Sequence, residues 1–315
     1  MALMSKSVTH NAASTEMTQV LQEWLQAHAD RIEGRLDRML LQPDGDLSQI
    51  YAAMRWAVLG AGKRLRAALV YASASACTAN VDPATEDALD RCAAAVELIH
   101  AYSLVHDDLP CMDDDDMRRG KAATHIEFGE AVALLAGDAM QPAAYEWLAG
   151  MAVAPGLIVQ AVQTLAVATG VQGMAGGQAI DLASAGHHLD EAALERMHSL
   201  KTGALLEASV MLGAIVTGAS STHRQALKRY ARAVGLAFQL TDDVLDVTAD
   251  SATLGKTAGK DTVHGKATYV SLLGVDRARA YAWELNQRAQ EALQELGPSA
   301  LYLRALSNLV VQRSY

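Results

Sequence analysis

Proline, cysteine and aromatic residues are scarce in this chain of 315 residues: it has 6 Pro, 3 Cys and 2 Phe, and aromatics make up 5%. Proline breaks helices and aromatic side chains favour strands, so this scarcity favours helices over a β-sheet fold. Three cysteines without a C-x-x-C pair do not form a disulfide framework or a zinc site. We therefore expect reduced thiols and a cytoplasmic location.

Positive charge and long apolar runs are lacking as well. The chain has 26 Lys and Arg against 36 Asp and Glu, which gives a formal net charge of −10. A nucleic-acid or anionic membrane surface requires the opposite sign, so we expect neither partner. No run approaches the roughly 18 apolar residues that a membrane span requires, so we expect no stable membrane insertion.

Alanine and helical periodicity dominate what is present. The chain has 60 Ala, the strongest helix former, and 51% of its residues are hydrophobic. From Met17 apolar residues recur at steps of three and four. The same periodicity fills residues 48–59, 64–79, 84–108, 128–150, 155–183, 190–218, 222–248, 267–295 and 298–312. This predicts one all-α domain of about ten helices over residues 16–315, preceded by a mobile segment at residues 1–15.

Two pairs of aspartates interrupt apolar helical segments: HAYSLVHDDLPCMDDDD at 100–116 and GLAFQLTDDVLD at 235–246. Asp242 and Asp246 are four residues apart and therefore share one helix face, which Gln239 joins. Pro110 breaks the first segment, so Asp113 can turn back towards Asp107. Buried carboxylates require a compensating cation, and oxygen donors without His or Cys suit Mg²⁺. Taken alone, the run 113–116 is more typical of a solvated loop.

The few basic residues cluster at breaks between helices, in GKRLR (62–66), MRRGK (117–121), KTG (201–203) and LGK (254–256). Lys and Arg beside glycine at helix ends suit phosphate oxygens. No P-loop or dinucleotide-binding glycine motif occurs, so a nucleotide-binding fold is not indicated. Each cluster alone is more typical of solvated surface. Together with two Mg²⁺-type sites, they favour a pocket for two diphosphates.

The motifs GKRLR, LVHDDLPCMDDDDMRRG, KTGALL, GLAFQLTDDVLD and LGK, in this order, resemble those of the trans-isoprenyl diphosphate synthases, and most closely those of the bacterial farnesyl diphosphate synthases. The resemblance implies the all-α isoprenoid synthase fold, a homodimer, and about three Mg²⁺ ions in a central cavity. Its substrates would be isopentenyl diphosphate and an allylic diphosphate, dimethylallyl or geranyl. The family usually has proline where this chain has Ala67.

The resemblance also implies residue roles. The metal ligands would be Asp107, Asp108, Asp113, Asp242 and Asp246, with Asp243 in the second catalytic motif. The allylic diphosphate would be held by Arg118, Lys201, Lys256 and Lys266, with Thr202 and Gln239 beside the reacting carbons. Isopentenyl diphosphate would bind at Gly62, Lys63, Arg66, His100 and Arg119.

Two residues shortly before the first aspartate motif bear on product length. Ser103 lies four residues before Asp107, about 6 Å along the helix, and is small enough for a ten-carbon chain to pass. Tyr102, five residues before Asp107, is bulky, and the resemblance implies that it limits the product to fifteen carbons, unless it is an ordinary core or interface aromatic. We therefore expect farnesyl diphosphate as the main product, with geranyl or geranylgeranyl diphosphate as alternatives.

Three other readings are compatible with parts of this pattern. A class I terpene cyclase ionises a similar substrate, but it does not need the GKRLR and MRRG clusters. A catalytically silent partner subunit would keep the fold and lose aspartates, whereas both motifs are complete here. An acidic helical scaffold with weak metal binding would release no diphosphate in the presence of Mg²⁺.

Overall fold

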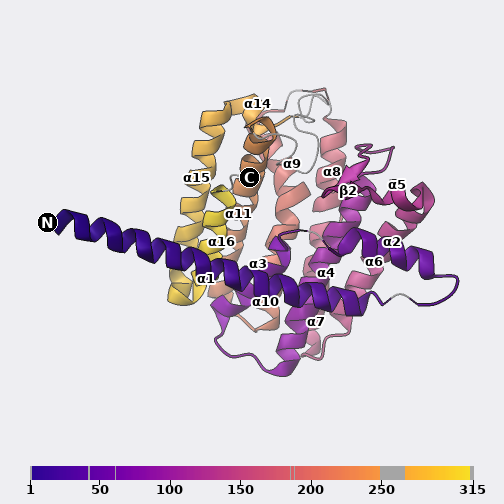
Figure 1. Cartoon of the computed structure of the whole chain (residues 1–315), viewed down its shortest axis with the longest axis horizontal. Helices are drawn as coiled ribbons and strands as arrows, with labels where there is room; N and C mark the ends of the chain where they lie inside the picture. The colour runs from indigo at the N-terminus through magenta and orange to yellow at the C-terminus, as the bar shows by residue number, and fades with distance from the viewer. Residues whose placement is uncertain are drawn as a thin grey trace.

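The computed structural model describes residues 2–41, 43–60, 62–184, 186–187, 189–248 and 267–312, and for residues 2–18 it describes the backbone alone. These residues form a helical bundle with one small hairpin (Figure 1). The first half contains α1 (Ala2–Met39), α2 (Ser48–Val58), α3 (Leu65–Cys77), α4 (Pro83–Asp107), β1 (Met117–Arg118), β2 (Lys121–Ala122), α5 (Thr124–Phe128), α6 (Glu130–Ala149) and α7 (Pro155–Thr169). The second contains α8 (Met174–Ala183), α9 (Glu191–His198), η1 (Ser199–Gly203), α10 (Ala204–Val216), α11 (Ser221–Thr248), α14 (Tyr269–Leu273), α15 (Val275–Ala292), η2 (Gln294–Ala300) and α16 (Leu301–Val311).

The all-α class predicted from the sequence is confirmed. Local signals explain where several helices begin: Asp82 caps α4 by accepting a hydrogen bond from the Thr85 N–H at 2.7 Å, and Pro83 occupies the first turn. Asp190 caps α9 in the same way. The antiparallel hairpin of β1 and β2, in which Arg118 pairs with Lys121, was not expected from the pattern.

Helix α10 is the central element of the bundle. It packs against α3, α4, α7 and α11, and ten of its thirteen residues are buried. A Cβ at Gly213 would collide with the Val70 carbonyl oxygen of α3, so the two helices cross closely at that point. The apolar core has two halves, and α3 and α10 contribute to both.

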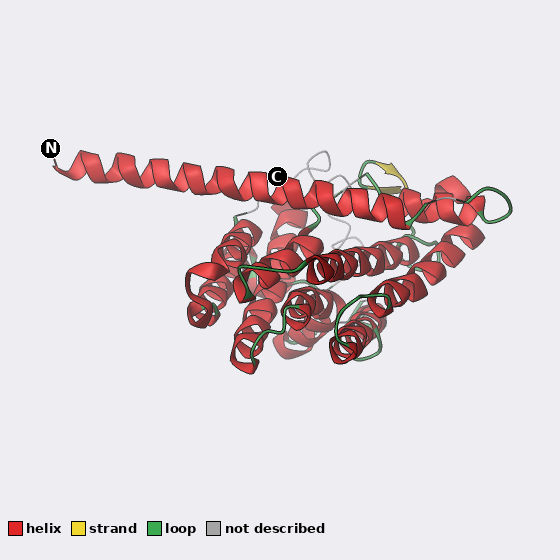
Figure 2. Cartoon of the chain, turned by 90° about the horizontal axis from the view of Figure 1, so that it is seen from below, coloured by secondary structure: helices red, strands yellow, loops and turns green. Residues whose placement is uncertain are grey.

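Helix α1 differs from its prediction. It is continuous from Ala2 to Met39, whereas the periodicity placed its beginning at Met17. It lies across one side of the bundle, and its N-terminal part extends beyond the other helices (Figure 2). Ile32 and Leu36 are fully buried where it crosses the core. The mobility of residues 1–15 stays a prediction.

Three predicted helices are interrupted in the structure. The segment 155–183 breaks between Thr169 and Met174, and 190–218 contains a π-helical turn, η1. The segment 267–295 is divided at Gly274 into α14 and α15. By length and composition alone, Pro155–Ala183 and Glu191–Val216 could cross a membrane, a test that core helices also pass. The second includes α10, which forms part of the core.

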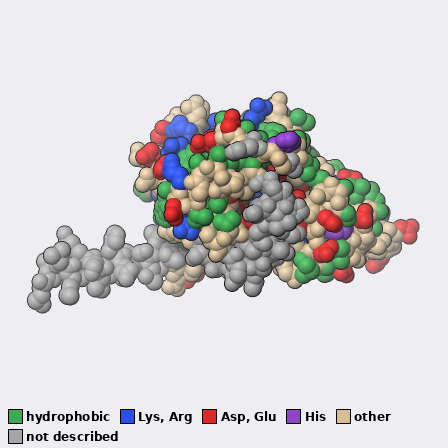
Figure 3. All heavy atoms as spheres, turned by 90° about the horizontal axis from the view of Figure 1, so that it is seen from above, with side chains coloured by type: hydrophobic (Ala, Val, Ile, Leu, Met, Phe, Trp, Pro, Cys, Tyr) green, Lys and Arg blue, Asp and Glu red, His purple; other side chains and the backbone are tan. Residues whose placement is uncertain are grey.

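Seen from the end of the bundle that carries α14, acidic and basic side chains are interspersed (Figure 3).

Candidate active site

The first aspartate motif folds back on the end of α4. Pro110 follows the helix, and the Asp113 N–H then donates to the Asp107 carbonyl at 2.8 Å, while the Asp115 N–H donates to the Asp108 carbonyl at 3.2 Å. Asp114 adopts a left-handed conformation in this turn, with φ of 50°. The backbone therefore returns Asp113 to Asp107, as the sequence predicted.

The Asp107 carboxyl is surrounded by charge of both signs. Burial raises its pKa to about 6, and the neighbouring Asp113 and Asp108 add to this effect. Lys201 and Arg118 oppose it. Because the charge of Lys201 lowers the pKa of Asp107, Lys201 of η1 must lie near the first aspartate motif. A carboxyl with a raised pKa among other carboxylates is a site that favours a bound cation.

Asp108 is held differently from Asp107. It is 2% exposed, and Arg118 donates to it through Nε at 3.0 Å and through Nη2. The Arg118 Nη2 also lies 3.3 Å from the Asp115 carboxylate. Arg118 therefore joins the hairpin to the acidic turn. In this arrangement Asp108 accepts hydrogen bonds from Arg118, and its role as a metal ligand stays a prediction.

The KTG motif lies in the π-helical turn η1. Such turns shift the faces of the flanking helices and are frequent at functional sites. Lys201 Nζ donates to Asp181 Oδ2 of α8 at 2.6 Å. A Cβ at Gly177 would collide with the Lys201 backbone nitrogen, so glycine is required for α8 to approach η1. Glycine and carboxylate together fix the position of this ammonium group.

A chain of hydrogen bonds links η1 to the second aspartate motif. The Thr202 hydroxyl donates to Gln239 Oε1 at 3.2 Å, and Gln239 Nε2 donates to Asp243 Oδ1 at 2.8 Å. The other oxygen of Asp243 accepts the Tyr269 N–H at 2.8 Å. Asp243, 3% exposed, thus uses both oxygens to position α11 against α14. Asp246 is buried as well, and Asp242 on the same helix is half-buried.

Arginines surround His100 on α4. Arg119 Nη2 lies 3.4 Å from His100 Nε2. Burial lowers the pKa of His100 well below its usual value, and the positive charges of Arg66, Arg119, Arg118 and Arg64 lower it further. The imidazole is therefore neutral at pH 7 and adds no further charge to the arginines around it. This group of residues is suited to binding an anion.

The basic loop 62–66 borders this group. Gly62 has φ of 121°, and a Cβ there would lie 3.4 Å from Arg119 Cζ. Arg64 and Arg119 are left-handed with φ of 47° and 53°, a conformation that costs non-glycine residues energy. Lys63 is exposed at the turn, and Arg66 lies in the first turn of α3. Of the predicted isopentenyl-site residues, Arg66 and Arg119 lie near His100, and Gly62 lies against Arg119.

Tyr102 and Ser103 lie on α4 below the first aspartate motif. Tyr102 is 8% exposed, and its ring packs edge-on against His106 with 5.7 Å between centroids. The Ser103 hydroxyl donates to the His100 carbonyl at 3.0 Å. A Cβ at Gly137 would collide with the His106 ring, so α6 closes tightly over this part of α4.

Two predicted residues, Lys256 and Lys266, lie outside the described residues. Within the described residues no group of three or more His, Cys, Asp or Glu side chains is arranged to hold a metal ion. The donor chemistry nevertheless fits Mg²⁺, because Asp107 and Asp113 supply carboxylate oxygens close to each other, and burial together with the Asp113 charge raises the pKa of Asp107. The remaining ligands of the ion would then come from the second motif, from water and from substrate oxygens.

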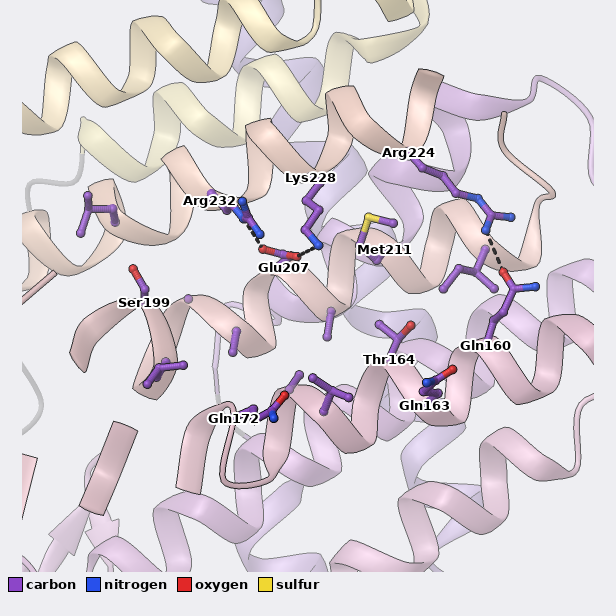
Figure 4. A pocket seen from close by; sticks show the side chains of 18 of the residues that line it. Gln160, Gln163, Thr164, Gln172, Ser199, Glu207, Met211, Arg224, Lys228 and Arg232 are labelled. Carbon is purple, nitrogen blue, oxygen red and sulfur yellow. Dashed lines mark hydrogen bonds and ion pairs between the residues drawn. The ribbon is translucent and has the colours of Figure 1, made fainter. Parts of the chain in front are cut away.

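A cavity of about 780 Å³ lies behind η1, between α7, α10 and α11 (Figure 4). Ser199, Leu200 and Gly203 of η1 line it, but none of the motif aspartates does. On its α11 side Lys228 and Arg232 both contact Glu207, and Arg224 donates to Gln160 of α7 at 2.8 Å. These basic groups are thus paired within the chain, and the cavity is separate from the aspartate motifs.

Sequence reasoning missed Asp181, which pairs with Lys201, and the buried pair of Arg64 and Glu97. A carboxylate in the otherwise apolar segment MAGGQAIDLA was the available signal for Asp181, since a buried acid requires a partner. Its partner lies twenty residues further along the chain, and spacing alone does not reveal that contact.

Comparison with known proteins gives consistent results. A family model described as polyprenyl synthetase matches residues 48–297. A farnesyl diphosphate synthase of Escherichia coli is 43% identical over 92% of this chain and 98% of its own length. A chloroplastic geranylgeranyl pyrophosphate synthase of Catharanthus roseus is 46% identical over 84% of this chain and 74% of its own. A geranyltransferase structure from Helicobacter pylori, complexed with magnesium and isoprenyl diphosphate, has a TM-score of 0.81 and 31% identity, covering 91% of this chain and 95% of its own.

Proposed function

Since this chain belongs to the polyprenyl synthetase family, we propose that its two aspartate motifs and its basic loops join two diphosphate substrates. It is a prenyltransferase that condenses isopentenyl diphosphate with dimethylallyl or geranyl diphosphate, and its main product is farnesyl diphosphate. The observation that carries the site assignment is the convergence on Asp107 of acidic and basic groups, including Asp113 and Lys201.

We propose the following division of labour in the reaction. Lys201, fixed by Asp181, and Arg118 hold the diphosphate of the allylic substrate, and their charge stabilises the anion as its C–O bond breaks. Thr202 and Gln239, hydrogen-bonded to each other, line the path of the allylic carbons. The double bond of isopentenyl diphosphate attacks the allylic cation, and a proton then passes to the released diphosphate. Apolar side chains exclude water from the cation.

Isopentenyl diphosphate would bind at the arginine group around His100. Arg66 and Arg119 supply charge there, and the neutral imidazole adds a hydrogen-bonding nitrogen without opposing charge. Gly62 and Lys63 complete the loop. Two separate diphosphate sites are what distinguishes this reaction from that of a cyclase, which needs only one.

Magnesium is the cofactor that we propose for the aspartate motifs. Asp107 and Asp113 cannot approach a diphosphate without a cation between the like charges. Asp242 and Asp246 of α11 would contribute from the second motif, and Asp108 is a further candidate. When bound, Mg²⁺ supplies positive charge to the leaving diphosphate. The Helicobacter pylori relative that carries magnesium supports this assignment.

We propose a homodimer formed through the outer faces of α6 and α7. Leu134 and Leu135 of α6 and Val159 and Val167 of α7 are 45–64% exposed. Such a run of exposed large hydrophobics on adjacent helices is typical of subunit interfaces. Light scattering should give twice the chain mass, and Leu135→Glu should shift the protein towards monomer. We also propose a cytoplasmic location, which the three unpaired cysteines support.

Product sizing tests the proposed function directly. Labelled isopentenyl diphosphate, geranyl diphosphate and Mg²⁺ should yield a labelled fifteen-carbon diphosphate, and addition of EDTA should stop its formation. A twenty-carbon main product would favour the geranylgeranyl alternative, consistent with the Catharanthus roseus relative. Release of diphosphate without label incorporation would instead indicate a cyclase.

A further inference from the structure

Glu97 is a buried carboxylate on α4 to which the sequence assigns no role. It is 3% exposed and lies one turn before His100. Its Oε2 accepts from Arg64 Nη1 at 3.1 Å, and its Oε1 accepts from the Ala67 N–H at 3.1 Å. Both oxygens therefore reach the segment that carries the basic loop 62–66.

Arg64 links Glu97 of α4 to Glu33 of α1 and to the end of α2. Its guanidinium is 5% exposed, and besides Glu97 it donates to Glu33 of α1 and to the Val58 carbonyl at 2.6 Å. Glu33 also accepts the Gly60 N–H at 2.5 Å. Glu33 therefore holds the turn between α2 and α3 at Gly60 and at Arg64, and the Arg64 end is the buried one.

Glu97 also supplies the cap that α3 otherwise lacks. The residue before α3 is Arg64, whose side chain makes no capping bond, and the first N–H groups of a helix require acceptors. Glu97 provides one from a different helix, where a carboxylate is also favoured by the helix dipole. Proline at position 67, usual in the family, has no N–H, so this contact depends on Ala67.

Three residues on one face of α4 each contact an arginine. Glu97, His100 and Asp108 are spaced by three and by eight residues, which places them along one stripe of the helix. Each contacts an arginine: Arg64, Arg119 and Arg118 respectively. Carboxylates stand at both ends of this stripe, and between them the neutral imidazole adds no negative charge. The middle of the stripe is therefore the part of this face that suits an anion.

We propose that Glu97 is a positioning residue for the isopentenyl diphosphate site, which holds the basic loop 62–66 in register with the His100 face of α4. Glu97 touches no substrate in this role and acts through Arg64 and the start of α3. The inference rests on the proposed function, because it takes the arginine group around His100 as the isopentenyl site.

Glu97→Gln tests the proposal, because it keeps the size of the side chain and removes its charge. We expect the KM for isopentenyl diphosphate to rise about tenfold, while kcat and the KM for geranyl diphosphate change by less than about twofold. Glu86→Gln is the matched control: Glu86 lies on the same helix and pairs with Arg31 at 2.7 Å, but it is exposed. Its kinetics should equal those of the unaltered chain.

Ala67→Pro provides a second variant that leaves every charge in place. It removes only the N–H that Glu97 accepts, so we expect a smaller rise in the isopentenyl KM, about twofold to threefold. If Glu97→Gln fails to fold, this variant carries the test alone. An unchanged isopentenyl KM, or an equal rise in both KM values, would overturn the proposal.

Calorimetry with inorganic pyrophosphate in EDTA separates this proposal from the proposed function. Without metal the aspartate motifs repel pyrophosphate, so binding reports the arginine group. We expect Glu97→Gln to weaken that affinity about tenfold and Glu86→Gln to leave it unchanged. Pyrophosphate binding with this dependence, in a protein that incorporates no isopentenyl label, would refute the proposed function and leave the positioning role intact. Equal affinities for both variants would refute the positioning role.

Discussion

The ammonium group of Lys201 and the carboxylate of Asp181 form a hydrogen-bonded ion pair, with 2.6 Å between Nζ and Oδ2. The two residues come from different helices, and the pair is largely shielded from solvent. It fixes a basic group whose charge acts on Asp107 of the first aspartate motif.

Asp181→Asn should impair use of the allylic substrate. The amide no longer neutralises or orients Lys201, so we expect kcat/KM for geranyl diphosphate to fall about tenfold, which corresponds to about 1.4 kcal/mol. Steady-state kinetics with saturating isopentenyl diphosphate measures this. Glu295→Gln, which breaks the exposed pair with Arg229, is the control. Equal values for both variants would show that the pair has no part in catalysis.

Asp107→Ala and Asp242→Ala should each lower turnover by orders of magnitude. Each removes a carboxylate from one of the two motifs, and circular dichroism should show unchanged helical content. Asp116→Asn, an exposed acid of the same turn, should keep near-normal activity. If either alanine variant retains normal turnover, its motif has no metal role.

Tyr102→Ala should lengthen the product. Its ring is buried against His106, and we expect that its removal leaves room for further five-carbon additions. Chromatography of the dephosphorylated products should show chains longer than fifteen carbons. Tyr102→Phe keeps the bulk and should keep the fifteen-carbon product. An unchanged distribution in the alanine variant would exclude Tyr102 as the residue that limits length.

His198 should make the protein less stable in acid. Burial lowers its pKa from 6.5 to about 4, and its ring stacks on Tyr269. Between these pH values the unfolded chain binds a proton that the folded chain does not. The free energy of unfolding therefore falls as the pH falls through this window, by at most about 3 kcal/mol from this group.

His198→Phe should remove that part of the pH dependence. Compared with the unaltered chain, the variant should gain relative stability as the pH is lowered from 7 to 4, measured by urea unfolding at each pH. His187→Phe, at an exposed position, is the control. Parallel stability curves for His198→Phe and the unaltered chain would contradict the assignment.

The sequence predicts the helices better than the contacts between them. Apolar periodicity and the Asp82 and Pro83 signals locate α4, and the four-residue spacing of Asp242 and Asp246 places both on one face of α11. The break after Thr169 was missed because apolar residues continue through it at helical steps. The π-helical turn at Lys201 was missed because it accompanies the close approach of α8 at Gly177, which is a tertiary effect.

The site was predictable where charge is concentrated in sequence. Asp107, Asp113 and Arg118 stand in one motif, and the structure brings them together. Asp181 and Glu97 each stand alone in apolar helices, and their partners are fixed only by how the helices pack. Asp243 was read with its neighbours as part of one acidic motif, but its two oxygens serve Gln239 and the Tyr269 N–H.

Substitution of Arg64, Asp114 or Arg119 by glycine is an obvious way to try to make this protein more heat-resistant. In the described part of the chain these are the non-glycine residues with left-handed backbone, and all three border the proposed diphosphate sites. Glycine at such a position relieves about 1 kcal/mol of strain. Substitution by glycine would also make the loops more flexible, and at Arg64 and Arg119 it would remove the guanidinium group. A thermostability screen without an activity assay would therefore select poorer catalysts at these positions.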